Sequence, residues 1–305
     1  MAKFDVNILG CGSATCTLRH LPSCQVLNIR DNLYMIDCGE GSQLQLRRMR
    51  LKFSRMSHIF ISHLHGDHVF GLPGLLSTMA LLDRTGQVTI HTFKEGAEQI
   101  KSILDYFCRD MPYEVSFNII SPAGGEVIYE NDAFSVTTVR LFHRIPTVGF
   151  IFREKPKLRH IVGDMAAYHG VPTYMMQKLR EGSDFVKPDG SIVPNAMLTT
   201  DPDPSVSYAY CSDTMYDDRV AQAVAGVDWL YHEATYHTNE EHKAHSRGHS
   251  TSAEAAQIAL KAGVKNLIIG HFSSQYSDDG LLLDDARRIF PSTYAANEGA
   301  TFSLL

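Results

Sequence analysis

Six short apolar segments of this chain each lead to an ionisable side chain, and this repeated pattern constrains the fold more than any other feature. The segments have the length of strands, and they are either alternating or continuously apolar. They begin at Asn32, His58, Phe134, Val206, Val227 and Lys265, and they lead to Asp37, His63, His143, Asp213, His232 and His271. Helical patterns separate several of them, at residues 43–49, 74–82, 95–107, 217–225 and 252–262. Strands mixed with helices in two successive halves predict an α/β fold with two packed sheets and helices outside, a four-layer αββα sandwich.

The polar residues at the strand ends are expected to share one edge of the sheet pair. Open α/β folds place their sites at the carboxyl ends of the strands. Any one of these residues alone is as well explained as a strand-ending cap. His143, Asp213 and His271 stand in the same position as His63, at the end of a strand, which favours one common site. Together these residues complete the coordination shells of two metal ions.

The sequence His63-Leu64-His65-Gly66-Asp67-His68 places three imidazoles and a carboxylate within six residues, directly after an apolar run. Imidazole nitrogen suits zinc and related divalent metals, and a carboxylate can hold a metal, a water or both. Four ligand-type residues exceed what one tetrahedral ion needs if a position must stay open for chemistry. The spacing therefore predicts two adjacent metals that share a catalytic water. The alternative, a solvated histidine-rich turn, fits this grouping at a strand end poorly.

Composition and length are those of a large globular domain. The 305 residues are 44% hydrophobic, and they are expected to form a single domain over residues 1–305. No stretch approaches the roughly 20 apolar residues of a membrane span, and the N-terminus enters a strand pattern without a secretory signal. The six cysteines form no Cys-x-x-Cys pair, so free thiols and a cytoplasmic location are expected. The net charge of −6 argues weakly against nucleic-acid binding, although the distribution of charge matters more.

Residues 153–197 interrupt the pattern of strands and helices. This segment is rich in proline and glycine, and it contains seven Lys or Arg against five Asp or Glu. A loop-rich segment of this length inside a compact domain is usually functional or disordered. We interpret it as an inserted arm that projects from the domain, with short helices at residues 158–168 and 173–179. The alternative is a poorly ordered insertion with no role. A second basic run, at residues 47–55, is equally consistent with a solvated face and with a phosphate contact.

Taken together, these motifs resemble those of the ribonuclease Z family, tRNA 3′-end endonucleases of the metallo-β-lactamase-fold superfamily. The resemblance covers nearly the whole chain. It rests on Asp37-Cys-Gly-Glu-Gly41, Ser62–His68 followed by Gly71-Leu-Pro-Gly74, His143, Ser212-Asp-Thr214, His232-Glu-Ala-Thr235, His249-Ser-Thr251 and His271. The histidine–aspartate motif alone marks only the superfamily, whereas the His-Glu-Ala-Thr and His-Ser-Thr elements and the arm narrow it to this family.

The resemblance implies a ligand set for two metals. One ion would be held by His63, His65 and His143, and the other by Asp67, His68 and His271, with Asp213 bridging both. Two zinc ions per subunit are expected, and manganese or iron would suit the same ligands. The family pattern also makes Asp67 the proton acceptor for the attacking water, which is chemically reasonable beside two cations.

His249 is the second candidate catalytic residue. Thr251 and Glu254 form a capping-box pair at the start of the 252–262 helix, and Gly263 suits its end. His249 would then lie beside a helix N-terminus, where it could donate a hydrogen bond to a phosphate oxygen or protonate the leaving 3′-oxygen. The alternative is a helix-entry residue with a packing role only.

Other polar residues near these motifs have less certain roles. Glu233 could orient His249 or a ligand histidine, and His232 could be structural; the sequence leaves both roles open. Asp37 fits a supporting or turn-shaping position better than a ligand. The remaining histidines are expected to be background: His58 and His91 packed or on the surface, and His237, His242 and His245 in a solvated loop.

The implied activity is cleavage of precursor tRNA 3′ of the discriminator, leaving a 3′-hydroxyl on the tRNA and a 5′-phosphate on the trailer. The resemblance also implies a homodimer in which the arm of one subunit presents tRNA to the site of the other, with residues 41–49 in the contact. The arm reads Gly170-Val-Pro-Thr where the family usually has a further Gly-Pro pair. Two alternatives remain: a hydrolase of the same fold that acts on a small phosphodiester, sulfate ester or lactone, and a metal-free RNA-binding or scaffold protein.

Overall fold

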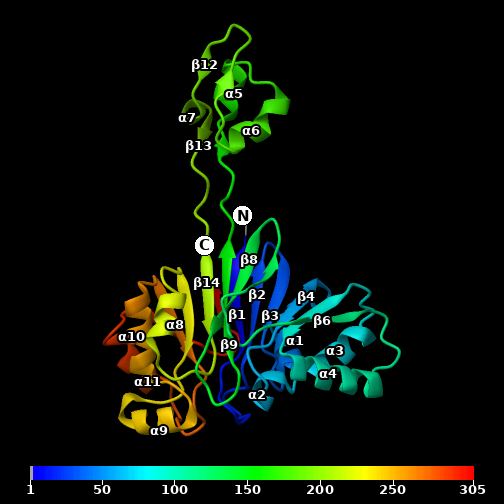
Figure 1. Ribbon diagram of the computed structural model, residues 1–305, viewed down its shortest axis with the longest axis vertical. Coiled ribbons are helices and arrows are strands. Elements are labelled where there is room, and N and C mark those ends of the chain that lie inside the picture. The colour runs from blue at the N-terminus through cyan, green and yellow to red at the C-terminus, as the bar shows by residue number, and fades with distance from the viewer. Residues whose placement is uncertain (1–2) are drawn as a thin grey trace. The chain divides into compact units, whose positions relative to one another are not determined.

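Two seven-stranded sheets packed against each other form the larger of two units in the computed structural model, which describes residues 3–305 (Figure 1). The first sheet has the order β18-β1-β2-β3-β4-β5-β6. Its strands are β1 (Phe4–Gly10), β2 (Cys24–Ile29), β3 (Asn32–Ile36), β4 (Met56–Phe60), β5 (Val88–Thr92), β6 (Val115–Ile119) and β18 (Thr301–Ser303). Strands β3 to β6 are parallel, so the segments that follow β3 and β4 emerge at the same edge.

The second sheet has the order β17-β16-β15-β14-β9-β8-β7. Its strands are β7 (Val127–Glu130), β8 (Phe134–Arg140), β9 (Val148–Glu154), β14 (Ser207–Cys211), β15 (Trp229–Glu233), β16 (Asn266–Gly270) and β17 (Thr293–Ala295). Strands β14 to β17 are parallel, and β9 runs antiparallel to β14. The carboxyl ends of β14 and β16 therefore meet at one edge, as the sequence pattern predicts.

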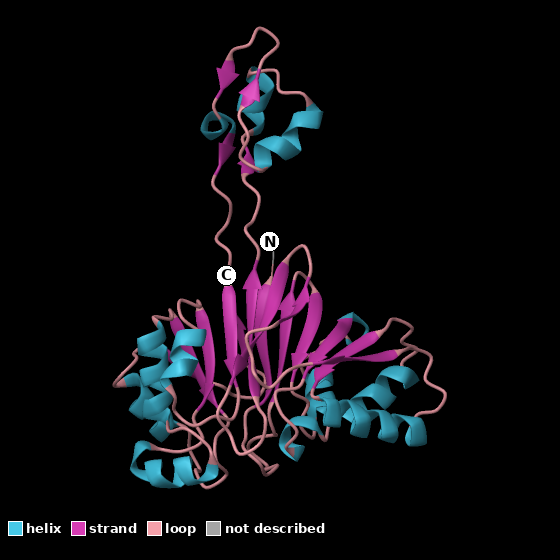
Figure 2. Cartoon of the chain, in the orientation of Figure 1, coloured by secondary structure: helices cyan, strands magenta, loops and turns pink. Residues whose placement is uncertain are grey.

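Helices cover the outer face of each sheet (Figure 2). The first sheet carries α1 (Ser42–Arg48), α2 (Gly66–Val69), α3 (Leu72–Leu81) and α4 (Lys94–Phe107), with the short 3₁₀ turn η1 (Phe53–Arg55). The second carries α8 (Asp218–Ala223), α9 (Glu241–Arg247), α10 (Ser252–Ala262) and α11 (Gly280–Arg287), with η3 (Thr238–Glu240) before α9. The four-layer αββα arrangement predicted from the sequence is confirmed.

Apolar side chains fill the space between the layers. Between the sheets, the Phe60 ring of β4 lies 5.5 Å from Phe150 and 5.3 Å from Phe152 of β9, centroid to centroid. A separate cluster joins the first sheet to its helices and includes Met35 and Leu76, both fully buried. Burying this apolar surface is the main term that stabilises the layered fold, and it fixes the strand ends at which polar residues gather.

Three local predictions are wrong. The strand predicted at residues 227–231 instead begins at Trp229 and includes His232 and Glu233, which therefore belong to β15. Residues 158–168 form a helix only from Gly163, because residues 160–161 pair as a strand instead. The segment with His237, His242 and His245 is a 3₁₀ turn and a helix rather than a loop, although His242 and His245 are exposed, as predicted.

The smaller unit, residues 154–205, has its own secondary structure and a small core. Its strand pairs are β10 (His160–Ile161) with β13 (Thr199–Thr200), and β11 (Phe185–Val186) with β12 (Ile192–Val193). Its helices are α5 (Gly163–Tyr168), α6 (Met176–Arg180) and α7 (Asn195–Leu198), with the turn η2 (Thr173–Met175). Leu179 and Leu198 are fully buried in it, and the Asn195 side chain donates to two backbone carbonyls. Within residues 3–305, helices long and apolar enough to span a bilayer are absent.

Candidate metal centre

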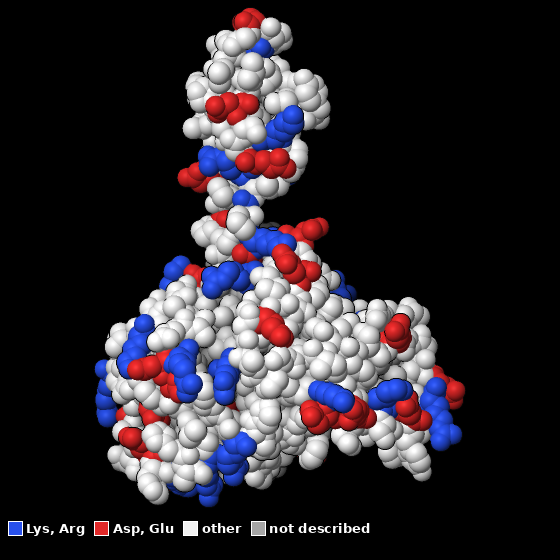
Figure 3. All heavy atoms as spheres, in the orientation of Figure 1, with Lys and Arg blue, Asp and Glu red and all other residues white. Residues whose placement is uncertain are grey.

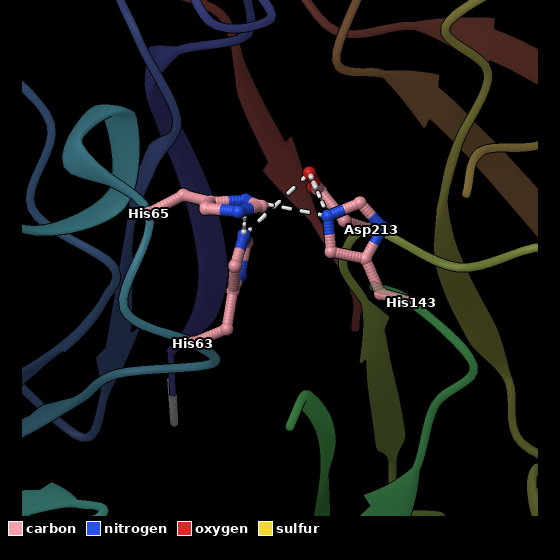
Figure 4. A group of neighbouring side chains, drawn as sticks. All are labelled: His63, His65, His143 and Asp213. Carbon is pink, nitrogen blue, oxygen red and sulfur yellow. Dashed lines mark hydrogen bonds and ion pairs between the residues drawn. The ribbon is translucent and has the colours of Figure 1, made fainter. Parts of the chain in front are cut away.

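The strand ends of both sheets bring the seven predicted ligand residues together in two groups. The first contains His63 and His65, which follow β4, His143, which follows β8, and Asp213, which follows β14. The second contains Asp67 and His68 of α2, and His271, which follows β16. Within each group the potential ligand atoms lie within 4.8 Å of one another. Figure 4 shows the side chains of the first group pointing toward a common centre.

Three ring nitrogens of the first group face one another. Nε2 of His63 lies 3.1 Å, and Nε2 of His143 lies 3.3 Å, from Nδ1 of His65. Burial lowers the pKa of all three imidazoles, which favours the neutral form, with a lone pair on one nitrogen of each ring. Oδ2 of Asp213 lies 3.6 Å from His63 Nε2 and 3.8 Å from His143 Nε2. Nitrogen lone pairs and a carboxylate around one point form a donor set suited to a divalent cation.

The second group holds two buried nitrogens without hydrogen bonds. Among the described residues, Nε2 of His68 and Nε2 of His271 have no hydrogen-bond partner. They lie 3.5 and 3.7 Å from Oδ2 of Asp67, and 3.4 and 3.2 Å from Oδ1 of Asp213. A buried polar atom left unpaired costs about 1–3 kcal/mol, so a persistent pair of them indicates another partner. The chemistry of these donors fits a metal ion.

Asp213 presents one oxygen to each group. Oδ2 faces the first group and Oδ1 faces the second, which is the position of a bridging ligand. Its complete burial acts to raise the pKa, but the neighbouring His271, His68 and His63 outweigh burial and hold the pKa well below its usual range. The carboxylate is therefore ionised, as a bridging ligand requires.

The second nitrogen of four ligand rings is held by a hydrogen bond. The pairs are His68 Nδ1 with Asp37 Oδ2 at 2.7 Å, His143 Nδ1 with the Gly248 carbonyl at 2.6 Å, His271 Nδ1 with Thr235 Oγ1 at 2.8 Å, and His63 Nδ1 with Ser62 Oγ at 3.1 Å. The Gly248 carbonyl can only accept, so Nδ1 of His143 carries the proton and Nε2 is free to bind a metal. Such contacts fix the tautomer and the orientation of a ligand ring.

Asp37 organises the first sheet's side of the site without joining either group of ligands. Its carboxylate accepts hydrogen bonds from the Ser62 backbone N–H, from the Ser62 hydroxyl and from Tyr210, each at 2.8 Å, besides the His68 ring. Burial acts to lower the pKa of His68, but the charges of Asp213 and Asp37 outweigh it and raise that pKa. A cation bound here therefore competes with a proton for the His68 ring.

Glu233 holds His249 beside the ligand groups. Its Oε1 lies 2.9 Å from Nδ1 of His249, and its Oε2 accepts the Thr235 hydroxyl proton at 2.6 Å. Since Thr235 has given its only proton to Glu233, it accepts from Nδ1 of His271, which leaves Nε2 of that ring free for a metal. Burial acts to lower the pKa of His249, but Glu233 raises it to about 9. His232, by contrast, pairs through Nδ1 with the Glu233 carbonyl at 2.7 Å and joins neither group.

The ligand groups open into a cavity of about 410 Å³. Asp67, Asp213 and His249 line it, together with Phe70 and Arg144, which the sequence analysis did not identify. Phe70 is 74% exposed at the cavity, which is unusual for a large apolar side chain. An aromatic face and a guanidinium beside the two ligand groups are side chains of the kinds that contact bases and phosphates. The only sequence signals for them were their positions, Phe70 two residues after His68 and Arg144 directly after His143.

A second missed feature is the approach of two loops to Asp67. The Ala14 backbone N–H donates to Oδ2 of Asp67 at 2.8 Å. Gly39 allows the loops to pack closely, because a Cβ at this position would lie 2.5 Å from the Asp67 carbonyl oxygen and 2.6 Å from Pro22. Packing therefore requires glycine at position 39 of the Asp37-Cys-Gly-Glu-Gly41 motif. This motif was the only sequence signal for the close approach of the loops.

Comparisons with known proteins give consistent results. The family model described as Anti-Pycsar protein Apyc1 matches residues 4–164, about half of the chain. Proteins named Ribonuclease Z from Parabacteroides distasonis and Bacteroides fragilis (strain YCH46) are 50% and 49% identical over 304 residues, covering 100% of both chains in each case. One from Porphyromonas gingivalis (strain W83) is 48% identical over 299 residues, covering 98% of both.

Solved structures resemble the fold of this chain over nearly its whole length. The short form of human tRNase Z (ELAC1) gives a TM-score of 0.71 at 24% identity, and it covers 99% of both chains. The metallo-β-lactamase fold protein YhfI from Bacillus subtilis gives 0.70 at 18% identity with the same coverage. At these identities the likeness concerns the fold, which is the metallo-β-lactamase fold.

Proposed function

Because this chain belongs to the ribonuclease Z family, and its residues 4–164 to the family described as Anti-Pycsar protein Apyc1, we propose that it is a metal-dependent tRNA 3′ endonuclease. It would hydrolyse the phosphodiester 3′ of the discriminator nucleotide in precursor tRNA, leaving a 3′-hydroxyl on the tRNA and a 5′-phosphate on the trailer. One observation carries the proposal: two groups of side chains that could bind metal meet at Asp213, in a chain half identical to these relatives along its full length.

The proposed ligands are His63, His65 and His143 for one ion and Asp67, His68 and His271 for the other, with Asp213 shared. Zinc is the proposed metal, and manganese or iron suits the same donors. When bound, two such ions supply Lewis acidity to the scissile phosphate and to the attacking water, whose pKa falls toward neutrality.

Asp67 would orient the attacking water and accept its proton. Burial acts to raise the pKa of Asp67, but His271 and His68, whose Nε2 atoms lie 3.7 and 3.5 Å from Oδ2, outweigh it and hold the pKa well below its usual range. Asp67 is therefore ionised at neutral pH, and its carboxylate could accept a proton from a water whose pKa bound metal ions had lowered. The Ala14 N–H would keep Oδ2 in place during this transfer.

His249 would act on the other side of the phosphate. Nδ1 of the ring is held by Glu233, and the pKa of about 9 keeps the ring protonated, so that Nε2 also carries a proton. Lining the cavity beside Asp213, the ring can donate to a phosphate oxygen or protonate the leaving 3′-oxygen. Either role requires Glu233 to keep the imidazole charged and oriented.

Binding of the tRNA body would belong to the 154–205 unit. Tyr168 and Tyr174 are 82% and 79% exposed there, and exposed aromatic rings offer stacking surfaces to nucleic-acid bases. We also propose a cytoplasmic homodimer in which each arm serves the site of the other subunit, as the family resemblance implies. The competing function, hydrolysis of a small phosphodiester or sulfate ester, is compatible with the same ligand groups but gives the arm no role.

One experiment separates the two functions. Purified protein is incubated with a precursor tRNA that carries a 3′ trailer and, separately, with bis(4-nitrophenyl) phosphate, before and after chelator treatment and readdition of zinc or manganese. We expect metal-dependent tRNA cleavage at one position, with a 3′-hydroxyl on the tRNA product. Turnover of only the small ester would reject the tRNA assignment, and undiminished tRNA cleavage by metal-free protein would reject the metal centre.

A further inference from the structure

A histidine outside the ligand groups joins the N-terminal loop to the C-terminal part of the larger unit. His20 lies in the loop between β1 and β2 and is 7% exposed. Its Nε2 lies 3.1 Å from Oδ2 of Asp279, which precedes α11, and its Nδ1 lies 2.9 Å from Oε2 of Glu298, which lies between β17 and β18. A single ring thus bridges two carboxylates from separate elements.

Glu298 also fixes both ends of the same loop. Its Oε1 accepts the Leu21 N–H at 2.9 Å and the Cys11 N–H at 3.4 Å, while Oε2 binds the His20 ring. The loop closes on itself through the Gly12 N–H, which donates to the Leu21 carbonyl at 2.9 Å. The conformation of residues 11–21 is therefore determined by one buried carboxylate and one imidazole.

Cys11, His20 and Glu298 also have the composition of a metal site. The charged groups at this position, however, already balance one another. Burial acts to lower the pKa of His20, but Asp279 and Glu298 raise it to about 9, so the ring is a cation between two anions. Arg19 adds a second cation, 2.6 Å from Asp279. Burial raises the pKa of the Cys11 thiol, which keeps it neutral. Two cations and two anions leave no charge for a metal to offset, so the group is an ion-pair clamp.

The loop held by this clamp reaches the proposed catalytic centre. Ser13, Ala14 and Cys16 line the cavity, and the Ala14 N–H donates to Oδ2 of Asp67. Ala14 has a φ of 55°, a left-handed conformation that is strained for alanine and is kept only where surrounding contacts enforce it. The Ser13 N–H donates to the carbonyl of Phe272, the residue after His271, so the loop is also tied to the ligand segment.

We propose that His20, clamped between Asp279 and Glu298, is a positioning residue that holds the loop so that the Ala14 N–H orients the Asp67 carboxylate. The proposal rests on the proposed function only in giving Asp67 its role in the hydrolytic step. It predicts that the clamp affects turnover more than substrate binding, since the clamp acts on the orientation of Asp67. Misplacement of a reacting group by about 1 Å can cost up to roughly a hundredfold in rate.

The test compares His20→Ala and the more conservative His20→Gln, whose amide can still donate to one carboxylate. Asp228→Asn is the matched control: Asp228 accepts from Ser207 at 2.7 Å and pairs with Lys265 at 2.6 Å, at the opposite ends of β14 and β15 from the ligand groups. Measured quantities are kcat and KM for bis(4-nitrophenyl) phosphate and precursor tRNA, bound metal, Tm, and amide hydrogen exchange of the 11–22 peptide.

We expect His20→Ala to speed exchange of the 11–22 peptide and to lower kcat for both substrates by roughly tenfold to a hundredfold, with little change in KM or metal content. His20→Gln should fall between wild type and His20→Ala, and Asp228→Asn should lower Tm without these effects. Unchanged loop exchange in His20→Ala, or a kcat loss no larger than that of the control, would overturn the proposal. If wild-type protein hydrolyses only the small ester, the proposed tRNA function is rejected. The role of the clamp is then still tested by the kcat for that ester.

Discussion

Asp213 links the two halves of the site through its two carboxylate oxygens. It lies at the end of a buried strand. The rings of His63, His68, His143 and His271 lie within 4 Å of its carboxylate, and His65 contacts His63 and His143. The cost of burying such a carboxylate is large unless it is paired with cations. A substitution of Asp213 would therefore remove the carboxylate around which the histidine rings of both groups are arranged.

Replacement of Asp67 tests the proposed proton acceptor. Asp67→Asn keeps an oxygen that can accept the Ala14 N–H but cannot take a proton from water, so kcat should fall by about 10²–10⁴-fold. Zinc content measured on the same sample shows whether the ion of the second group is retained. Asp105→Asn, exposed on α4 and paired only with Lys101 in the described contacts, serves as the control. Normal turnover of tRNA by Asp67→Asn would refute the assignment.

Phe70 offers a test of how the cavity distinguishes RNA from a small ester. Base stacking on an aromatic side chain contributes about 1–3 kcal/mol of binding free energy. Phe70→Ala should therefore raise the KM for precursor tRNA by about five- to hundredfold. Hydrolysis of bis(4-nitrophenyl) phosphate should change little. Phe107→Ala, equally exposed at 75% but on α4, is the matched control. Equal effects of the two variants on tRNA would exclude a base contact at Phe70.

At the scale of secondary structure, α10 shows what local sequence can predict. The helix spans Ser252–Ala262 as predicted, the Thr251–Glu254 capping box is present, and Gly263 ends the helix with a φ of 64°. These signals are local: each depends on residues at most a few positions apart. The same is true of the ligand positions after β4, because an apolar strand followed by clustered histidines is visible within one short segment.

Thr251→Ala should lower the free energy of unfolding by about 1–2 kcal/mol, because it removes the cap of α10 at Glu254 N–H. Urea denaturation of metal-free protein measures this directly. Ser102→Ala, in the middle of α4 and exposed, should leave stability nearly unchanged. If both variants unfold at the same urea concentration, the capping box contributes nothing to stability.

The elements that sequence could not predict depend on contacts between distant residues. Helix α9 has no apolar stripe, and Ala244 is its only buried residue in the described structure; the helix is held by Gly248 at its end and by His245, 2.6 Å from Glu254. Likewise, Ala14 and Asp67 are 53 positions apart, and His20 and Glu298 are 278 apart. Such contacts follow from the packing of the sheets, and no local pattern reports them.

At the scale of the whole molecule, net charge does not explain binding of RNA. The chain carries a net charge of −6, and Figure 3 shows acidic and basic side chains interspersed on the visible face of each unit. Phosphate contacts would therefore come from individual lysine and arginine side chains rather than from a continuous basic surface. In the proposed complex, exposed aromatic side chains such as Tyr168 and Tyr174 would then contribute more of the affinity.

If the 154–205 unit binds the tRNA body as proposed, its removal should separate tRNA recognition from phosphodiester hydrolysis. Arg153 and Ser207 are paired across β9 and β14, and the Ser205 hydroxyl donates to the Lys155 carbonyl, so a short Gly-Ser linker can replace residues 156–204. The unit has its own small core, so its removal should leave the core between the two sheets intact. We expect kcat/KM for precursor tRNA to fall by roughly a hundredfold or more, which is the loss of about 3 kcal/mol of binding. Hydrolysis of bis(4-nitrophenyl) phosphate should be retained.

A less invasive variant guards against misfolding of the shortened chain. Tyr168→Ala combined with Tyr174→Ala leaves the unit in place and removes only its two most exposed rings, with Tyr106→Ala on α4, 68% exposed, as the control. The double variant should lose tRNA turnover mainly through KM, because stacking contributes to binding rather than to the hydrolytic step. The shortened chain could lose activity equally toward tRNA and the small ester, while the double tyrosine variant keeps normal activity. That result would show that the unit stabilises the fold and does not bind the substrate.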